Sequence, residues 1–412
     1  MRFKKFLTCS VVVCLFLIIM STPISAGITL RVIAEETPDV DIVKQLVPEF
    51  EKKTGIKVEI EDMAYEGLLE KMMPQFIAPT STYNIVQVIN YWSERFSYSG
   101  FLEPLSTRIA KTEGYEWNDF FRPIRENGMY KGVVYGLPFY NWALGLVVRQ
   151  DIFDNAGIEV PTTVEEYLRN CKALTDRENN FYGVSMMAKR GTCMLEEAMC
   201  YTFGMGGVAT LDSEGNVILD NEANIKGFKY YVENLFNSAP KGARVWAFDE
   251  AFRLMSEGQA ASMITYNWMI SALNDPKQTG ELAGKYKLYE TPGGKAVLGL
   301  WHWSIPKNAK DKDAAWEFIS WLTSKEMQKR AALLGGAPVR KSVIDILEPE
   351  QYRRVLKLIL EDAEPVVQSL YAEEITAIMA LHMSRATAGQ IPPEEALKAA
   401  AEEIRQLLAK AK

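Results

Sequence analysis

Apolar residues follow two alternating spacings along the first part of the chain. Residues 29–34 and 84–90 are short, mostly apolar runs, and the apolar positions of 56–61 alternate with charged ones, so three strands are predicted. Between them, residues 43–50 and 65–76 carry apolar side chains at helical spacing, which predicts two helices. The order strand–helix–strand–helix–strand is typical of an open α/β sheet.

The alternation continues through the rest of the chain. Residues 143–148 are apolar and bounded by charge, which predicts a strand buried on both faces. Residues 162–175 open with a capping-box pattern, and 248–258 predict a helix that ends at a glycine before a short strand. Residues 313–332 predict one long amphipathic helix, and the chain from Pro349 onward is predicted to be almost wholly helical.

One stretch does not follow the pattern. Gly136-Leu137-Pro138 is expected to break any regular element, yet it runs directly into Phe139, Tyr140, Asn141 and Trp142 and then into the buried strand. Three aromatic side chains and an amide between a breaker and a strand are more than a turn needs. We therefore expect this segment to pass close to a functional surface.

The first 26 residues have the pattern of a secretory signal peptide. A basic start with Arg2 and Lys4 precedes an apolar run from Phe6 to Met20, and small residues then end at Ala26. An uncleaved anchor is the alternative. A lipoprotein is disfavoured because Cys9 lies inside the apolar run. We expect an exported protein that is periplasmic or extracellular.

Length and charge narrow the class further. The chain has 412 residues, which favours two domains, and 48% hydrophobic with 24% charged residues is ordinary for a globular protein. Removal of the first 26 residues takes the formal net charge from −7 to −10. An acidic chain without a basic run argues against a nucleic-acid partner.

The three cysteines after the leader do not form a disulfide framework. Cys193 and Cys200 are seven residues apart, which on one helix places their Cα atoms about 10 Å apart, too far for a bridge. A bridge from Cys171 to either is left open. Buried thiols that pack as small hydrophobic groups are the favoured interpretation.

Aromatic and polar residues gather after the predicted strands. In open α/β sheets, ligands bind beyond the carboxyl ends of the strands, so these residues are expected to meet in one cleft. Aromatic rings suit the apolar faces of a sugar, and amide or carboxylate groups suit its hydroxyls. Packing in the core is an equally good explanation for any single one of them. The candidates from strand ends are Glu35, Glu36, Tyr65, Glu66, Tyr91, Trp92, Tyr266, Asn267, Trp268, Trp301, His302 and Trp303.

Signals for catalysis, metals and cofactors are weak. Two histidines, His302 and His382, are too few for a histidine-based metal site, and no nucleophile-elbow, zincin or phosphate-loop pattern occurs. The adjacent pair Glu196–Glu197 is interpreted as a solvated helix face, and Tyr230–Tyr231 as part of an amphipathic helix. We expect no enzyme activity, no metal and no cofactor.

Several stretches together resemble the extracellular solute-binding proteins of bacterial sugar ABC importers, the group that includes maltose-binding protein. The similarity covers nearly the whole chain after residue 26 and is most specific in the stretch from Gly132 onward. The stretches that carry it are LVPEFEKKTGIKVEIED, YWSERFSYSGFLEPLS, GVVYGLPFYNWALGLVVRQDIFDNAGIEVPTTVEEYL, EGQAASMITYNWMI, IPKNAKDKDAAWEFISWLTSKEMQ and GQIPPEEALKAAAEEIRQLL.

This resemblance implies a two-lobe periplasmic-binding-protein fold, each lobe an open, mostly parallel sheet flanked by helices, with the ligand cleft between the lobes. The N-terminal lobe is expected to comprise 27–136 and 304–345, and the C-terminal lobe 137–303 and 346–412. Residues 136–138 are expected to be crossing backbone, and 139–142 to enter the cleft. The resemblance also implies a monomer that closes around a carbohydrate and delivers it to membrane permease subunits.

The resemblance assigns further positions to the cleft. Tyr91, Trp92, Asn267 and Trp268 match positions that line it, and Lys189-Arg190-Gly191 matches a second-lobe loop that often does. We further expect Trp92, Tyr140, Asn141 and Trp268 to surround one sugar ring. The Trp301-His302-Trp303 segment departs from maltose-binding protein, so a maltose-type oligosaccharide is in doubt. There are two alternative hypotheses. One is an exported glycosidase, and the other is a binder of a polyamine, phosphonate or compatible solute.

The leader generates a direct prediction. N-terminal sequencing of the exported protein should begin at Gly27, because Ala26 ends the small-residue segment that signal peptidase recognises. A protein that keeps Met1, or that begins at a lipidated cysteine, would contradict this assignment.

Overall fold

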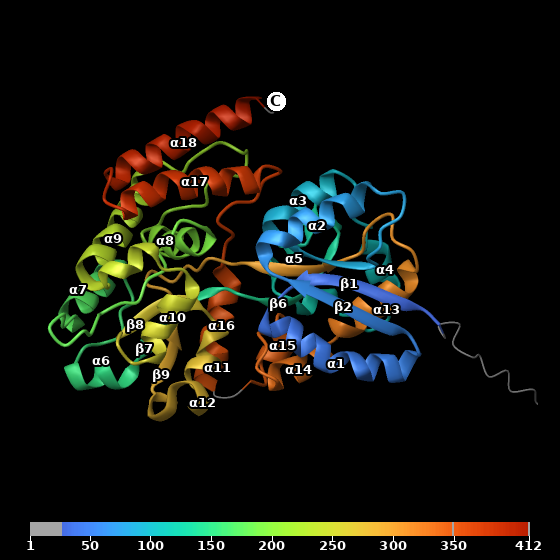
Figure 1. Cartoon of the computed structure of the whole chain (residues 1–412), viewed down its shortest axis with the longest axis horizontal. Helices are drawn as coiled ribbons and strands as arrows, with labels where there is room; N and C mark the ends of the chain where they lie inside the picture. Colours follow the sequence, from blue (N-terminus) through green and yellow to red (C-terminus); the bar gives the residue numbers. More distant parts are fainter. Residues whose placement is uncertain (1–26, 348–349, 411–412) are drawn as a thin grey trace, which may run out of the picture.

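The computed structural model describes residues 27–347 and 350–410, so the expected signal peptide at 1–26 lies outside the described residues. These residues form two lobes side by side, with β6 (Gly136–Asn141) and α16 (Glu350–Asp362) between them (Figure 1). Each lobe has its own sheet, one of five strands and one of three. The two-lobe α/β architecture is therefore confirmed, and the residue limits of the lobes stay a prediction.

The five-stranded sheet has the order β2-β1-β3-β10-β6. Strands β2, β1 and β3 are parallel, and β10 runs antiparallel to both of its neighbours. Strand β3, in the middle of the sheet, is buried along its whole length because helices cover both faces of this sheet. Its strands are β1 (Thr29–Glu35), β2 (Lys57–Met63), β3 (Ile85–Ile89), β6 (Gly136–Asn141) and β10 (Leu300–Ser304).

Helices from two distant parts of the sequence surround this sheet (Figure 1). The small β4–β5 ribbon (Met129–Tyr130 with Val133–Val134) lies beside α3. The helices are α1 (Pro38–Thr54), α2 (Tyr65–Ile77), α3 (Asn90–Tyr98), α4 (Ser106–Lys111), α5 (Arg122–Asn127), α13 (Lys312–Leu322), α14 (Lys325–Leu333) and α15 (Lys341–Ile344).

The second sheet has the order β8-β7-β9, with β7 buried along its whole length. Both pairings are antiparallel, so the expectation of a mostly parallel sheet was wrong for these three strands. The elements of this lobe are β7 (Leu144–Arg149), β8 (Ser262–Tyr266), β9 (Tyr286–Tyr289), α6 (Gln150–Ala156), α7 (Val164–Leu174), α8 (Thr192–Gly204), α9 (Glu222–Ser238), α10 (Phe248–Ser256), α11 (Met269–Leu273), α12 (Pro276–Thr279), α17 (Ala372–Thr387) and α18 (Pro393–Lys410).

Local sequence explains where α1 and α7 begin and where α1 ends. The Thr37 side chain caps α1 by accepting a hydrogen bond from the Val40 N–H, and Gly55 ends the helix with φ of 75°. The predicted capping box opens α7, where the Thr163 side chain and the Glu166 carboxylate bond each other's backbone N–H. The cap of α1 fixes the turn from β1 into this helix, next to the cavity residues Thr37 and Asp39.

Two expectations about regular elements were wrong. Gly136 to Asn141 forms strand β6, which pairs only with β10 and so lies at the sheet edge, where the missing N–H of Pro138 is tolerated. The expected single helix over 313–332 is two helices, α13 and α14. Ser324 separates them because its hydroxyl accepts from the Met327 N–H and caps the second helix.

Two connections between the lobes run side by side. The chain leaves β6 at Asn141 and enters β7 at Leu144, and it returns from 297–299 into β10. The Trp142 N–H donates to the Gly299 carbonyl at 3.1 Å, and the Leu144 N–H donates to Val297 at 3.0 Å. The Trp142 indole lies against Gly299 so closely that a methyl group there would overlap the ring.

We predict that Gly299→Ala displaces Trp142, lowers the melting temperature and weakens solute binding, because overpacking of this kind costs about 1–3 kcal/mol. Gly67→Ala on α2 is the matched control. A methyl group there would meet only the Met63 sulfur, at an ordinary contact distance of 3.7 Å, and alanine removes the cost of a helical glycine. Thermal melting and titration calorimetry of both variants check this; equal melting temperatures would contradict the tight contact.

Candidate functional site

A cavity of about 410 Å³ lies where the two lobes face each other. Its first-lobe wall comes from the ends of β1, β3, β6 and β10 and from the first turns of α1 and α2. Its second-lobe wall comes from the loop before α8, the first turns of α8 and the end of β8. The lining residues are Glu35, Thr37, Pro38, Asp39, Tyr65, Ile89, Tyr140, Trp142, Lys189, Arg190, Gly191, Thr192, Cys193, Glu196, Ala247, Tyr266, Trp268 and Trp301.

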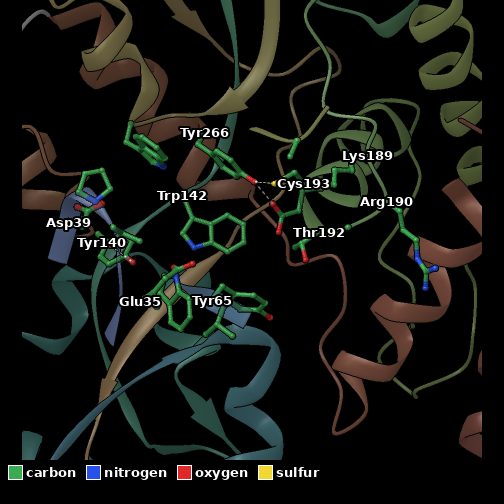
Figure 2. Close-up of a pocket in the computed structure, with 18 residues that line it drawn as sticks. Glu35, Asp39, Tyr65, Tyr140, Trp142, Lys189, Arg190, Thr192, Cys193 and Tyr266 are labelled. Carbon is green, nitrogen blue, oxygen red and sulfur yellow. Dashed lines mark hydrogen bonds between the residues drawn. The ribbon is translucent and has the colours of Figure 1, made fainter. Parts of the chain in front are cut away.

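The structure brings more than half of the sequence candidates together in this cavity. Trp142 lies between two groups of them, with Tyr266 on one side and Tyr65 beside Glu35 on the other (Figure 2). The candidates that line it are Glu35, Tyr65, Tyr140, Lys189, Arg190, Gly191, Tyr266, Trp268 and Trp301. The candidates with described side chains that do not are Glu36, Tyr91, Trp92, Asn141, Asn267, His302 and Trp303.

The alternation of side chains in a strand explains two of the misplaced candidates. Strand β1 ends at Glu35, whose side chain lines the cavity, so its neighbour Glu36 is exposed instead. Trp301 lines the cavity from β10, and His302 is buried against Gly128 and Gly136. Burial lowers the pKa of His302 to about 4, so this ring is neutral at physiological pH.

Tyr91 and Trp92 lie behind the cavity wall, in the first turn of α3. Trp92 stacks on Tyr65 with ring centroids 5.3 Å apart and meets Trp301 edge-on at 5.8 Å. The Tyr91 hydroxyl donates to Glu196 Oε1 at 3.0 Å. Both residues therefore support side chains that line the cavity, and the Tyr91 hydrogen bond joins the two lobes.

Asn141 and Asn267 are core residues at the connection between the lobes. Both are fully buried, and Asn267 Nδ2 donates to Asn141 Oδ1 at 2.8 Å. Asn141 Nδ2 donates to the carbonyl oxygen of Pro338 at 3.2 Å. Asn141 therefore joins β6, the segment before α15 and the loop after β8. Its position does not fit the expectation that Asn141 faces a sugar ring.

Three lining residues carry chemistry that the sequence analysis did not assign. Trp142 belongs to the unusual stretch 136–142, but its sequence position alone does not assign it to a site. Asp39 lies at the second position of α1. Glu196 was interpreted as solvated, yet it and Glu197 are 1% and 0% exposed, so that interpretation was wrong. The signal was available, because α8 is otherwise almost uncharged, and carboxylates inside an apolar helix are seldom solvated.

Burial controls the electrostatics of the cavity. It raises the pKa of Asp39 to about 7, although the Ala337 N–H bonds this carboxyl and partly offsets the effect. Burial likewise raises the pKa of Glu196 to about 8, against hydrogen bonds from Tyr266 and Tyr91. The Tyr266 hydroxyl is 2.9 Å from Glu196 Oε2 and 3.3 Å from the Cys193 sulfur (Figure 2).

Two buried polar atoms among the lining residues have no hydrogen-bond partner. They are Asp39 Oδ1, an acceptor, and Trp142 Nε1, a donor. Asp39 is 5% exposed and Trp142 is 8% exposed. Buried polar atoms are rarely left unpaired, so an occupant of the cavity that reaches both atoms would have to offer a donor to Asp39 and an acceptor to Trp142.

Cysteines and metal-ligating groups contribute little chemistry. All three described cysteines are free thiols; Cys171 and Cys200 are buried and Cys193 is half-buried. Within the described ranges, no three His, Cys, Asp or Glu side chains gather to hold a metal ion. A search of the same residues for a helix long and apolar enough to span a bilayer found none.

The family model for bacterial extracellular solute-binding proteins matches residues 34–329. The chain belongs to this family. The match includes most of both cavity walls, from the end of β1 to α14. The cavity between the lobes is therefore the candidate solute site, and the expected family is confirmed.

Curated relatives are distant and carry different ligand names. The solute-binding chain is 24% identical over 324 residues to a probable amino-acid ABC transporter periplasmic-binding protein of Sinorhizobium fredii, covering 77% of this chain and 74% of that one. It is 21% identical over 345 residues to the erythritol/L-threitol-binding protein of Mycolicibacterium smegmatis, covering 78% and 72%.

A solved structure supports the same fold. The ABC transporter solute-binding protein of Agrobacterium radiobacter K84 in complex with ribitol superposes with a TM-score of 0.82 and 27% identity, over 93% of this chain and 99% of that one. The architecture of the solute-binding chain is thus the same over nearly its whole length.

The buried Glu197 gives a stability prediction. Burial raises its folded pKa to about 8 from an ordinary value of 4.5, so the folded state holds a proton that the unfolded state has lost. Stability should therefore fall as pH rises from about 4.5 to 8. Glu197→Gln, which cannot ionise, should flatten this slope in melting curves at pH 5 and pH 8.

The control is Glu233→Gln. Glu233 lies on α9 and is exposed, so its carboxyl group is in water in both the folded and the unfolded state. A slope that Glu197→Gln leaves unchanged would show that Glu197 is ionised in the folded protein.

Proposed function

We propose that this solute-binding protein captures a carbohydrate of monosaccharide or polyol size and presents it to the permease of an ABC importer. The observation that carries the proposal is the cavity of about 410 Å³ between the lobes, walled by aromatic rings and carboxyl groups from both of them. Cavities of this size hold a small ligand and bury most of its surface.

The chemistry of the wall supports a hydroxylated ligand. Tyr266 and Trp268 are nearly parallel, with an interplanar angle of 4° and ring centroids 6.1 Å apart, and Trp142 meets Tyr266 edge-on at 5.7 Å. Such rings cover the C–H faces of a polyol. Asp39 and Glu196 offer oxygen atoms to its hydroxyl groups. The relatives named for erythritol/L-threitol and ribitol are consistent with this class.

We propose closure of the lobes as the mechanism, with no chemical change to the solute. Ligand favours closure only to the extent that it binds the closed form better than the open form. Three hydrogen bonds from α3 reach the second lobe: Tyr91 to Glu196 at 3.0 Å, Trp92 to Glu373 at 2.7 Å and Arg95 to Glu374 at 2.8 Å. These bonds would break when the lobes separate, so they help to hold the closed state.

The remaining parts of the proposal concern the protein's surroundings. We infer that it acts as a monomer outside the cytoplasmic membrane, after cleavage of its leader. The family supports an extracellular location, and the pattern of residues 1–26 supports export by a signal peptide. A glycosidase would be recognised by product formation, whereas a binding protein removes about one equivalent of unchanged solute.

The test is titration calorimetry against erythritol, ribitol, D-mannitol, D-glucose and maltose. We expect a compound of four to six carbons to bind and maltose to bind weakly. In the variant Trp268→Ala, the lost ring area should weaken binding by roughly 2 kcal/mol, about 30-fold, with little change in the melting temperature.

Trp316→Ala is the matched control, because Trp316 is also half-buried but lies on α13, away from the cavity. Asn141→Ala should instead lower the melting temperature, because it removes the hydrogen bonds that join three segments. If no member of the panel binds, the carbohydrate assignment fails. If Trp268→Ala binds normally, the proposed aromatic wall is wrong.

A further inference from the structure

The carboxyl groups that line the cavity are more buried than the cations that line it. Glu35, Asp39 and Glu196 contribute carboxyl groups from both lobes, and the last two are buried. The cations that line it, Lys189 and Arg190, are exposed and lie on the loop before α8. Figure 2 shows the Arg190 side chain extending away from Trp142. The inner part of the cavity is therefore acidic, and its cations lie at the rim.

The two unpartnered atoms define what an occupant must offer. Asp39 Oδ1 requires a donor, and Trp142 Nε1 requires an acceptor. An ammonium group can serve the first but not the second, because it has no free lone pair. A hydroxyl group can serve the second. A ligand that carries only amines leaves the Trp142 donor unpaired, which costs binding energy.

The aromatic rings favour positive charge beside the carboxyl groups. The Tyr266 ring contacts the rings of both Trp142 and Trp268. The faces of such rings attract cations, most strongly when water is excluded. An acidic and aromatic cavity therefore stabilises an ammonium group more than a neutral hydroxyl in the same place.

We propose that the preferred ligand is an amino-substituted polyol or amino sugar, with its protonated amine at Asp39 and a hydroxyl group accepting from Trp142 Nε1. This inference rests on the proposed function and narrows its ligand class. It places the amine in the first lobe, at the start of α1, and the hydroxyl groups across the connection between the lobes.

The pKa values of two lining carboxyl groups are consistent with this preference. Burial raises the pKa of Asp39 to about 7 and that of Glu196 to about 8, because no cation compensates for lost hydration. An ammonium group beside Asp39 would stabilise its ionised form. A neutral polyol would leave the cost of burying that charge in place.

The experiment compares matched ligands that differ by one group. The pairs are D-glucitol with D-glucamine, ribitol with 1-amino-1-deoxyribitol, and D-glucose with D-glucosamine, titrated calorimetrically at pH 7.5. We expect the amine to bind about 10- to 100-fold more tightly in at least one pair, because hydrogen bonds to charged groups are stronger than neutral ones. Putrescine should bind more weakly than that amine.

Two variants assign the preference to its atoms. Asp39→Asn should remove the advantage of the amine while the neutral member still binds, and Trp142→Phe should weaken both members of the pair alike. Asp41→Asn is the control, because Asp41 also lies in the first turn of α1 and loses the same charge, but is exposed. Melting temperatures of the variants separate binding effects from loss of fold.

Each outcome decides between the two proposals. If the neutral member of every pair binds as tightly as the amine, or if Asp39→Asn keeps the amine's advantage, the inference is overturned and the carbohydrate function stands. Tighter binding of putrescine overturns the requirement for hydroxyl groups. If no neutral or aminated member binds, the proposed function fails together with the inference.

Discussion

The contact of the Trp142 indole with Gly299 is the constraint on which the site depends. Here the two neighbouring connections between the lobes run side by side, joined by the hydrogen bond from the Trp142 N–H to the Gly299 carbonyl. Because position 299 has no side chain, the indole can lie across the second connection and still reach the cavity. Trp142 therefore takes part both in the junction between the lobes and in the wall of the candidate solute cavity.

A second constraint comes from carboxyl groups held in an apolar setting. Glu196 lies on α8 in the second lobe, and its two oxygens are bonded by Tyr91 from the first lobe and Tyr266 from its own. A buried carboxyl group without partners would be costly, so its site is stable only when both hydroxyls are in place. Glu196 thus lines the cavity and also accepts a hydrogen bond that joins the two lobes.

Much of the fold could be predicted from the sequence, because its signals are local. The alternation in β2, the capping box of α7 and the glycine after α1 follow from neighbouring residues alone. The failures arose where a distant partner decides. Residues 136–141 form a strand although they contain glycine and proline. They pair with β10 as the edge strand of the sheet, where the missing backbone N–H of Pro138 is tolerated.

The sequence by itself determined the class of protein and the kinds of residues that line its cleft, since aromatic and acidic side chains follow its strands. Only the tertiary structure decided which of two neighbours faces the cavity: Glu35 and not Glu36, Trp301 and not His302, Trp142 and not Asn141. The physical reason is that the direction of a side chain depends on strand register and on what packs behind it. Register is set by pairing with segments far away in the chain.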